Sequence, residues 1–439
     1  MVERVNATPG GAPNVAIVGG GYAGMAAATE LARAGWPVTV FEAARVLGGR
    51  ARRVETQAAH LDNGLHILLG AYRETLRLID IVRQPGEPVG VLRLPLQLII
   101  HPAFRLSTPR LPAPLHLLSA LLGATGLGLR ERLAALRFMV WAQRNAFELA
   151  ADTTLATLLE RHRQPPAVSR YLWHPLCVSA LNTPPQEASA QVFLNVLRDS
   201  ISGQRGNSDL LLPTLDFSAL FPERAARYIE THGGRVHSGF AVDALRHTEK
   251  GFEIPANSAC YSHAIVAVSA HRAAALLAPH TALAPVVRLI DRLTYRPIYS
   301  VYLQYDPQIR LPFAMGGLEA RYTQWVFDRG QLCGQRGMIG VVISSSGAHQ
   351  ALAHDDLAHA VSAELAEAFP GLGKPHWHQV IAEKRATFSC TPHLVRPGNA
   401  TPIQRLYLAG DYTASEYPAT IESAVRSGVS AARLVLQHA

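Results

Sequence analysis

A glycine-rich turn near the start of the chain has the spacing of a phosphate-binding loop. Gly19, Gly21 and Gly24 follow the apolar run 15–18. The first glycine allows a tight turn, the second lets the backbone approach a pyrophosphate, and the third lets a helix pack closely on a strand. Glu42 lies about twenty residues further on, where a carboxylate can accept hydrogen bonds from an adenosine ribose. The spacing predicts a dinucleotide site, which NAD and FAD could both use.

The elements around this turn are those of a βαβ unit. Residues 15–18 have strand character, an alanine-rich helix follows Gly24, and a second strand at 37–41 ends on Glu42. The pyrophosphate would lie at the helix N-terminus, where free N–H groups and the helix dipole favour an anion. The βαβ pattern therefore predicts an α/β fold with a Rossmann-like domain.

Strand and helix patterns continue along the rest of the chain. We expect strands at 235–237 and 241–242, 264–268, 298–305, 338–344 and 406–408. Helices are expected at 222–232, 362–369 and 422–438, and the region 152–200 looks helical with a polar interruption at 181–185. Together these patterns predict a mixed sheet in a second domain.

The region before the helical middle is unusually apolar. Residues 111–129 carry no formal charge, a length that approaches a membrane span. Prolines at its start and glycines near its end argue against one spanning helix, and a short helix beginning near Pro114 fits better. Residues 131–150 could form a basic amphipathic surface helix or an ordinary helix that packs on a core.

Composition restricts the classes of function. The chain has 439 residues, of which 48% are hydrophobic and 17% charged, with a net charge of +8. This charge invites a membrane or nucleic-acid interpretation, but without a Lys/Arg run or zinc spacing we expect no nucleic-acid partner and no metal site. Four dispersed cysteines fit a reducing, cytoplasmic compartment. The first thirteen residues are expected to be disordered.

Motifs at both ends of the chain resemble the FAD-dependent amine oxidase and carotenoid desaturase superfamily. They are the cradle with Gly48, Gly49 and Arg50, and the turn at Gly410 and Asp411 before the last helix. The resemblance implies that the cofactor is FAD, held by both ends of the chain, and that the last helix points its N-terminus at the flavin. A helix N-terminus would stabilise negative charge on a reduced flavin.

Four internal segments resemble the hydroxysqualene dehydroxylase family within that superfamily. They are DNGLHILLGAYRET at 62–75, LPAPLHLL at 111–118, PLCVSALNTP at 175–184 and EYPATIESA at 416–424. Leu65 departs from the pattern, which has glutamine there. The resemblance implies reductive removal of the hydroxyl of hydroxysqualene, a C30 isoprenoid, to give squalene. It also implies an external electron donor and partner enzymes of the squalene-synthase type. The amphipathic stretch 131–150 would bring the protein to the cytoplasmic face of a membrane, where a C30 substrate partitions.

The resemblance also implies the domain boundaries and the site residues. The FAD-binding domain would comprise 14–75, 205–275 and 395–439, and the substrate domain 76–204 and 276–394. Asp62, His66 and Glu416 are the candidate proton donors, and each could instead be structural. The predicted cofactor-binding residues are Gly19, Gly21, Ala23, Gly24, Glu42, Gly49, Arg50, Asn63, Gly64, Val242, Gly410, Asp411, Thr420 and Ile421.

The reaction that the resemblance implies starts from an allylic alcohol, so loss of water would leave a delocalised cation, which hydride from reduced FAD would then quench. Aromatic faces can stabilise such a cation, and Tyr412, Tyr417 and Trp173 are candidates that could equally be core aromatics. Two other functions stay open. One is an oxidising flavoenzyme, either a carotenoid-type desaturase or an amine oxidase, and the other is a non-catalytic, FAD-bearing lipid carrier.

Overall fold

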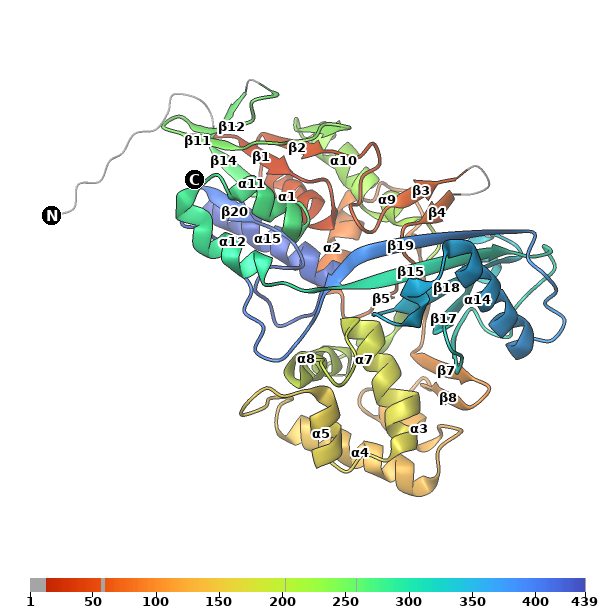
Figure 1. Cartoon of the computed structure of the whole chain (residues 1–439). Coiled ribbons are helices and arrows are strands. Elements are labelled where there is room, and N and C mark those ends of the chain that lie inside the picture. Colours follow the sequence, from red (N-terminus) through yellow and green to blue (C-terminus); the bar gives the residue numbers. More distant parts are fainter. Residues whose placement is uncertain (1–12, 57–59, 202, 258, 439) are drawn as a thin grey trace.

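The computed structural model describes residues 13–56, 60–201, 203–257 and 259–438. A parallel sheet with its helices forms the upper part of the molecule in Figure 1, a mixed sheet crosses the middle, and a layer of helices lies below. The predicted disordered segment falls almost wholly outside the described residues.

The upper sheet has five parallel strands. Their spatial order is β10 (Arg235–Ser238), β2 (Val38–Glu42), β1 (Val15–Val18), β14 (His263–Val266) and β20 (Leu406–Leu408). All residues of β1, β14 and β20 are buried, as expected for parallel strands that are covered on both faces. This is the Rossmann arrangement that the glycine spacing predicts.

Small residues let two helices pack closely beside this sheet. α1 (Tyr22–Arg33) contacts α15 (Ile421–Gln437), the last helix of the chain. A Cβ atom at Gly428 would lie 2.1 Å from the carbonyl oxygen of Ala23. The N-terminal and C-terminal cofactor motifs are therefore joined through a tight helix pair.

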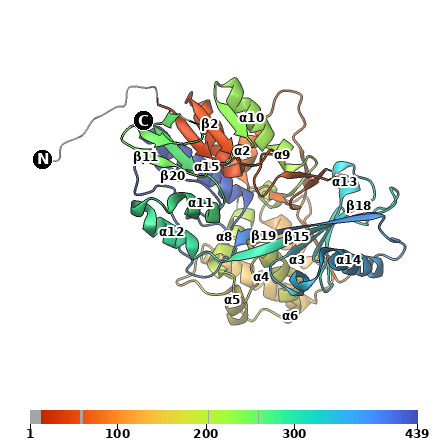
Figure 2. The same cartoon turned by 45° about the horizontal axis from the view of Figure 1, so that its top comes forward.

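The mixed sheet has seven strands. Their order is β19 (Trp377–Phe388), β15 (Tyr295–Gln304), β18 (Met338–Ser344), β17 (Trp325–Asp328), β16 (Met315–Leu318), β7 (Gln97–His101) and β8 (Phe104–Ser107). Side chains alternate between its faces. Val301, Val341 and Val380 pack against α14 (His354–Ala368), which lies beside the sheet in both views (Figures 1 and 2). Trp325, Phe327 and Val342 of the other face point toward the helical layer and line the cavity described below.

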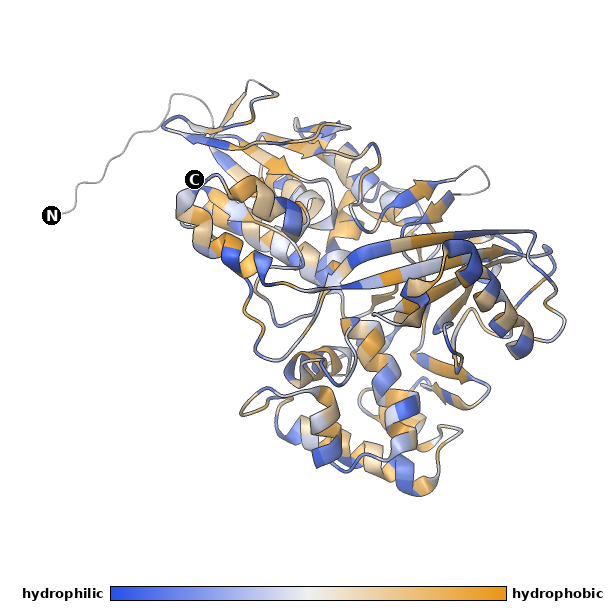
Figure 3. Cartoon of the chain, in the orientation of Figure 1, coloured by the Kyte–Doolittle hydropathy of each residue, from blue (hydrophilic) through white to orange (hydrophobic). Residues whose placement is uncertain are grey.

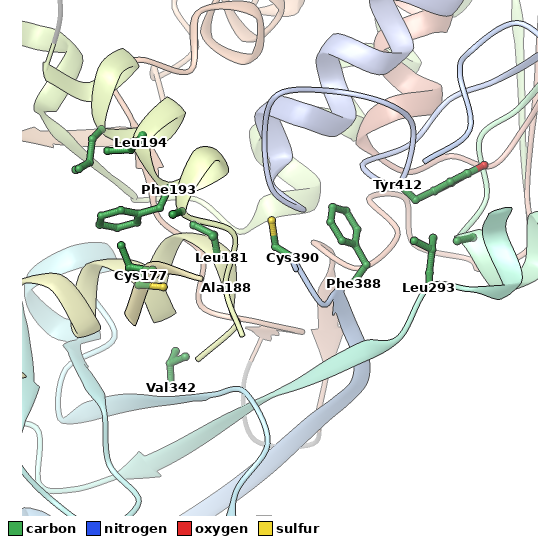
Figure 4. Close-up of a cluster of buried hydrophobic side chains, with 14 of the residues drawn as sticks. Cys177, Leu181, Ala188, Phe193, Leu194, Leu293, Val342, Phe388, Cys390 and Tyr412 are labelled. Atoms are coloured by element: carbon green, nitrogen blue, oxygen red, sulfur yellow. The ribbon is translucent and has the colours of Figure 1, made fainter. Parts of the chain in front are cut away.

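The lower layer consists of short helices. They are α3 (Leu115–Leu122), α4 (Leu129–Arg144), α5 (Leu155–Arg161), α6 (Pro166–Val168), a π-helix (Ser169–Trp173), α7 (His174–Leu181) and α8 (Ala190–Ile201). Their core continues without a break into the sheet and the C-terminal turn. Figure 4 shows Cys177, Leu181 and Phe193 in the same cluster as Phe388 and Tyr412.

Smaller elements complete the fold. The helices are α2 (Arg73–Val82), α9 (Phe217–Leu220), α10 (Pro222–Thr231), α11 (Ala270–Leu277), α12 (Ala284–Asp291) and α13 (Arg329–Cys333). The strands are β3 (Arg53–Glu55), β4 (His60–Asp62), β5 (Leu68–Leu69), β6 (Val91–Leu94), β9 (Leu210–Pro213), β11 (Arg246–Thr248), β12 (Gly251–Glu253) and β13 (Cys260–Tyr261). Single 3-10 turns occupy Arg205–Ser208, Thr281–Leu283 and Ala348–Ala351.

The five parallel strands come from the three segments assigned to the FAD-binding domain. The boundaries themselves stay a proposal, because β9 in segment 205–275 pairs with β6 in segment 76–204. The strand expected at 241–242 is wrong, since the chain there is coil after β10. Within the described part of the chain, no helix combines the length and apolarity needed to cross a bilayer.

Candidate active site

One cavity of about 520 Å³ lies where the parallel sheet, the mixed sheet and α7 meet. Its walls include the turn between β1 and α1, the loop 48–52, the polar turn 63–67 and the start of α15. The inner face of the mixed sheet supplies another wall. The cavity therefore runs from the dinucleotide turn to the face that α14 leaves uncovered.

The glycine turn has the close approaches that its spacing predicts. Gly19 has φ +117°, and a Cβ there would lie 2.6 Å from the carbonyl oxygen of Ala267. A Cβ at Gly24 would lie 1.9 Å from the carbonyl oxygen of Gly19, so only glycine lets α1 begin so close to β1. Gly24 itself lies behind the cavity wall, whereas Gly19, Gly21 and Ala23 line the cavity.

Glu42 is held at the end of β2 by the backbone. Its carboxylate accepts hydrogen bonds from the N–H of Gly20 at 2.7 Å and of Ala44 at 2.8 Å. Its side chain also lines the cavity. The carboxylate is thus oriented before any ribose hydroxyl reaches it.

Arg50 joins the two cofactor motifs directly. Its Nη2 lies 2.5 Å from Oδ1 of Asp411, and its Nη1 donates to the carbonyl of Ala386 at 2.6 Å. Burial opposes the charge of Arg50, but the Asp411 carboxylate raises the pKa of the guanidinium, so Arg50 keeps its positive charge. Arg50, Gly410 and Asp411 all line the cavity.

The start of α15 contributes backbone donors to the same cavity. The Thr420 side chain caps the helix by accepting from the N–H of Ser423 at 3.1 Å, and Thr420 and Ile421 line the cavity. The positive end of this helix therefore faces the site, as the resemblance implies.

Asp62 is not in the cavity wall. Its Oδ1 accepts from the N–H of Phe217 at 2.9 Å, and its Oδ2 lies 3.7 Å from Nη1 of Arg329. Its backbone carbonyl accepts from the Tyr302 hydroxyl at 2.8 Å. Burial raises the pKa of its carboxyl to about 6, although Arg329 acts in the opposite direction. These contacts give Asp62 a structural position, and its catalytic role stays a prediction.

His66 lines the cavity, in the same turn as Asn63 and Gly64. Its ring packs edge-on against Phe217, and its Nε2 is buried without a hydrogen-bond partner. Burial and the neighbouring charge of Arg50 lower the pKa of His66 to about 4. The lowered pKa favours the neutral ring near pH 7, which does not suit the predicted role of His66 as a proton donor.

Glu416 and Val242 lie outside the cavity wall. The Glu416 side chain is 65% exposed and pairs with Arg198, whose Nη2 is 2.8 Å from its Oε2. Val242 is a half-buried coil residue that packs on the core. Their predicted site roles therefore have no support from the geometry.

The aromatic residues in the cavity differ from the predicted ones. Tyr412 and Trp173 belong to the core, and the Tyr417 hydroxyl is bonded to Asp199. Trp325 and Phe327 of β17 line the cavity instead, beside Met315, Ile298 and Val342. Strand alternation was the signal for these residues, but the sequence alone does not tell which face of the sheet meets the site.

Leu65 occupies the position where the resemblance has glutamine. Its side chain lines the cavity and packs over Gly340, where an added Cβ would lie 2.5 Å from Leu65 Cδ1. The contact is apolar, so this position extends the hydrophobic surface of the sheet rather than supplying a hydrogen bond.

The residues present fit a flavin dinucleotide. The glycine turn and Gly49 expose backbone to the cavity, Glu42 is placed for the ribose, and Arg50 and the α15 N-terminus supply positive charge for the pyrophosphate and flavin. The fold and this site define a flavin-dependent oxidoreductase of the two-domain type.

The chain belongs to the flavin containing amine oxidoreductase family, whose model matches residues 22–436. Its cofactor is FAD. The hydroxysqualene dehydroxylase of Rhodopseudomonas palustris is 30% identical, over 96% of this chain and 98% of the relative. That of Sinorhizobium fredii is 29% identical, over 97% of this chain and 99% of the relative. These relatives confirm the narrower resemblance to the hydroxysqualene dehydroxylases.

Solved structures share the fold at low identity. An oxidoreductase from Methanosarcina mazei matches 95% of this chain and 99% of its own with a TM-score of 0.73 and 14% identity. Cyclohexylamine oxidase from Brevibacterium oxydans matches 98% of this chain and 99% of its own with a TM-score of 0.67 and 19% identity. Both similarities confirm the two-domain fold.

Proposed function

We propose that this protein removes the hydroxyl group of hydroxysqualene reductively, giving squalene. The observation that carries the proposal is a cavity in which a dinucleotide cradle opens onto an apolar sheet face. An apolar C30 chain fits such a face. Relatives that are up to 30% identical to this chain are named hydroxysqualene dehydroxylase. The alcohol is allylic, so loss of water leaves a delocalised cation.

FAD, when bound and reduced, supplies a hydride to that carbon. The chain contributes the surroundings. Trp325 and Phe327 offer aromatic faces to a developing cation, and Met315 and Val342 keep the site apolar, which excludes water that would trap the cation. An external donor must return two electrons after each turnover.

An anaerobic single-turnover experiment tests this function. The purified yellow protein is reduced, freed of excess reductant and mixed with hydroxysqualene. We expect one equivalent of squalene and return of the oxidised flavin spectrum. A desaturase or an amine oxidase that starts with oxidised flavin would instead reduce that flavin when its own substrate is added. A lipid carrier would bind hydroxysqualene without any change in the flavin.

The desaturase alternative has weaker support. The 15-cis-phytoene desaturase of Synechococcus elongatus is 24% identical over 96% of this chain, below the identity of the dehydroxylases at similar coverage. For an amine oxidase, we would expect a polar or aromatic-caged site, whereas the aromatic residues of this wall, Trp325 and Phe327, lie on one strand and are flanked by aliphatic side chains.

We also propose that the protein docks on the cytoplasmic face of a membrane through α3 and α4. Six large apolar side chains on these helices and on the segment just before α3 are exposed, namely Leu111, Leu115, Leu122, Leu129, Leu133 and Val140. Four exposed arginines lie among them, namely Arg110, Arg130, Arg137 and Arg144. Figure 3 shows apolar and polar segments interleaved along these helices. Anionic lipids complement this combination of charge and apolar surface.

Flotation with vesicles tests the docking surface. We expect binding to vesicles that contain anionic lipid and a loss of affinity of about 30-fold or more in the double variant Leu129→Ser, Leu133→Ser, since each exposed leucine contributes about 1 kcal/mol or more on insertion, or about 2 kcal/mol together. Val395→Ser, which changes an apolar residue that is 66% exposed elsewhere, is the matched control. Equal flotation of all three proteins would contradict the proposal. Partner enzymes of the squalene-synthase type that form the C30 substrate would meet the protein at the same membrane.

A further inference from the structure

Dehydroxylation requires an acid that protonates the leaving hydroxyl, and the cavity offers few. Among the described residues, three carboxylates line it: Glu42, Glu383 and Asp411. Glu42 is bound to two backbone N–H groups at the ribose end, and Asp411 is paired with Arg50. Glu383 is the carboxyl that the cofactor cradle does not use.

Strand register puts Glu383 on the same wall as the apolar residues. Glu383 of β19 is paired directly with Ile298 of β15, and Ile298 is paired with Ser344 of β18. Directly paired residues of antiparallel strands point to the same face of a sheet. Ile298, Ser344 and Glu383 all line the cavity, so the carboxyl stands at the edge of the wall that continues to Val342 and Trp325.

Glu383 also reaches toward the cofactor segments. Its Oε2 lies 3.5 Å from Nδ2 of Asn63, which donates at 3.1 Å to the carbonyl of Arg50. Its Oε1 accepts from the N–H of Arg385 at 3.2 Å. The carboxyl is therefore between the polar turn after the cradle and the apolar wall, where the reacting end of a substrate must meet the flavin.

The chain beside Glu383 connects it to solvent. Glu383 is half-buried, and the next two residues, Lys384 and Arg385, are exposed. A proton lost from the carboxyl can be replaced from water on this side while the wall on the other side stays apolar. The charged and titratable groups that surround it are Arg50, His271, Arg385 and, next to it in sequence, Lys384. The charge of Arg50 is already compensated by Asp411.

We propose that Glu383 is the catalytic acid of the dehydroxylation, an inference that rests on the proposed function. The proton passes from the Glu383 carboxyl to the substrate hydroxyl oxygen. The C–O bond then breaks, its electron pair leaves with the oxygen as water, and Glu383 remains as a carboxylate. The allylic carbon, now short of two electrons, takes the hydride that the proposed function supplies. Solvent then returns the proton to Glu383.

Single-turnover kinetics of Glu383→Gln test the proposal, because glutamine keeps the shape but carries no transferable proton. We expect the rate of squalene formation to fall at least 100-fold, with unchanged FAD content and unchanged affinity for hydroxysqualene measured by quenching of flavin fluorescence. Glu383→Asp should restore part of the rate. Glu367→Gln, which changes an exposed carboxyl on α14, is the matched control and should react like the wild type.

The pH profile separates an acid from a structural residue. In the wild type the single-turnover rate should fall as pH rises, because a general acid acts only while it carries its proton, and Glu383→Gln should lose this dependence. His271 is a second titratable group nearby, and its titration could also make the single-turnover rate depend on pH. His271→Asn is therefore measured in parallel and should keep the wild-type pH profile.

The possible negative results distinguish a failure of the proposed function from a failure of the acid assignment. If the wild type forms no squalene, the proposed function fails and the acid assignment fails with it. If the wild type forms squalene and Glu383→Gln does so at the same rate, the function stands and the acid assignment is overturned. Loss of FAD from Glu383→Gln would also overturn it, because the residue would then hold the cofactor.

Discussion

The parallel sheet and the mixed sheet meet at one cavity, yet they contribute to it in different ways. The parallel sheet presents strand ends, where turns at Gly19 and Gly410 and the N-termini of α1 and α15 offer backbone groups. The mixed sheet presents a flat face of side chains, including Trp325 and Glu383. The cofactor half of the site is thus made mainly of backbone geometry, and the substrate half of side-chain chemistry.

This difference predicts how each half tolerates substitution. The cradle has no space for a larger side chain, so substitutions that add atoms should cause the most damage there. In the substrate wall, the backbone is regular and changing polarity is the damaging change. The following predictions test the contrast, from the largest expected effect to the smallest.

Gly24→Val should break the cradle. The new Cβ would lie 1.9 Å from the Gly19 carbonyl oxygen, so α1 or the turn must move. We expect a loss of about 3 kcal/mol or more of unfolding free energy and loss of bound FAD, measured by denaturant titration and by flavin absorbance. Gly398→Ala, where an added Cβ meets nothing within 4 Å, is the control and should stay yellow. A yellow, stable Gly24→Val protein would refute the close-packing account.

Asp62→Asn should change the pH dependence of the unfolding free energy and leave the substrate wall unchanged. Because burial raises the pKa of Asp62 to about 6 in the folded state, from 3.8, the folded protein binds the proton more tightly than the unfolded chain. Wild-type stability should therefore fall as pH rises from about 4 to about 6, by an amount on the order of 3 kcal/mol from this group. Asn cannot titrate, so the variant should lose this slope.

The measurement is chemical denaturation of both proteins between pH 4 and pH 7. The stability difference, variant minus wild type, should grow with pH across this window. A constant difference would mean that Asp62 has an ordinary pKa. If the variant keeps squalene formation, Asp62 is structural, as its bonds to Phe217 and Arg329 indicate.

Val342→Thr should damage the substrate wall without affecting the cradle. The swap keeps the size of the side chain but places a hydroxyl on the face that lines the cavity. We expect about a tenfold lower single-turnover rate with normal FAD content, since an unpaired hydroxyl costs about 1–2 kcal/mol in an apolar site. Val341→Thr, one residue earlier, faces α14 and is the matched control. It should lose stability but not rate, and equal rates for the two variants would contradict the wall assignment.

The Arg50–Asp411 pair should show coupling in FAD affinity. Arg50→Met and Asp411→Asn each remove one partner of an ion pair that joins the two cofactor motifs. In a double-mutant cycle we expect the two changes to be non-additive by about 1 kcal/mol, measured by FAD titration of the apoproteins. Additive losses would show that the two residues bind the cofactor independently.

Local motifs made the cradle and much of the secondary structure predictable. The helix beginning near Pro114, the interruption at 181–185 and the closing helix are confirmed as α3, the break after α7, and α15. These features depend on short-range properties such as proline, capping and apolar periodicity. By contrast, 362–369 was expected as a short helix, whereas α14 begins at His354, because the polar first turn hides the helical periodicity.

Site residues could be predicted only where they belong to short motifs whose spacing along the chain sets their position. Gly19, Glu42, Arg50 and Asp411 lie where their motifs imply, whereas Asp62, Glu416 and Val242 do not reach the cavity. A polar residue inside a recognised motif can face either the site or the core. Only the packing of neighbouring elements decides between the two.

The sequence by itself determined that the cofactor is a dinucleotide and that one domain is Rossmann-like, because a βαβ glycine turn needs residues at set positions within a single short segment. The tertiary structure alone decided which carboxyl faces the substrate wall. That choice depends on the register of β19 against β15, which shifts between Arg296 and Ile298. Since neighbouring residues of a strand point to opposite faces, a change of one position in this register would turn Glu383 away from the cavity.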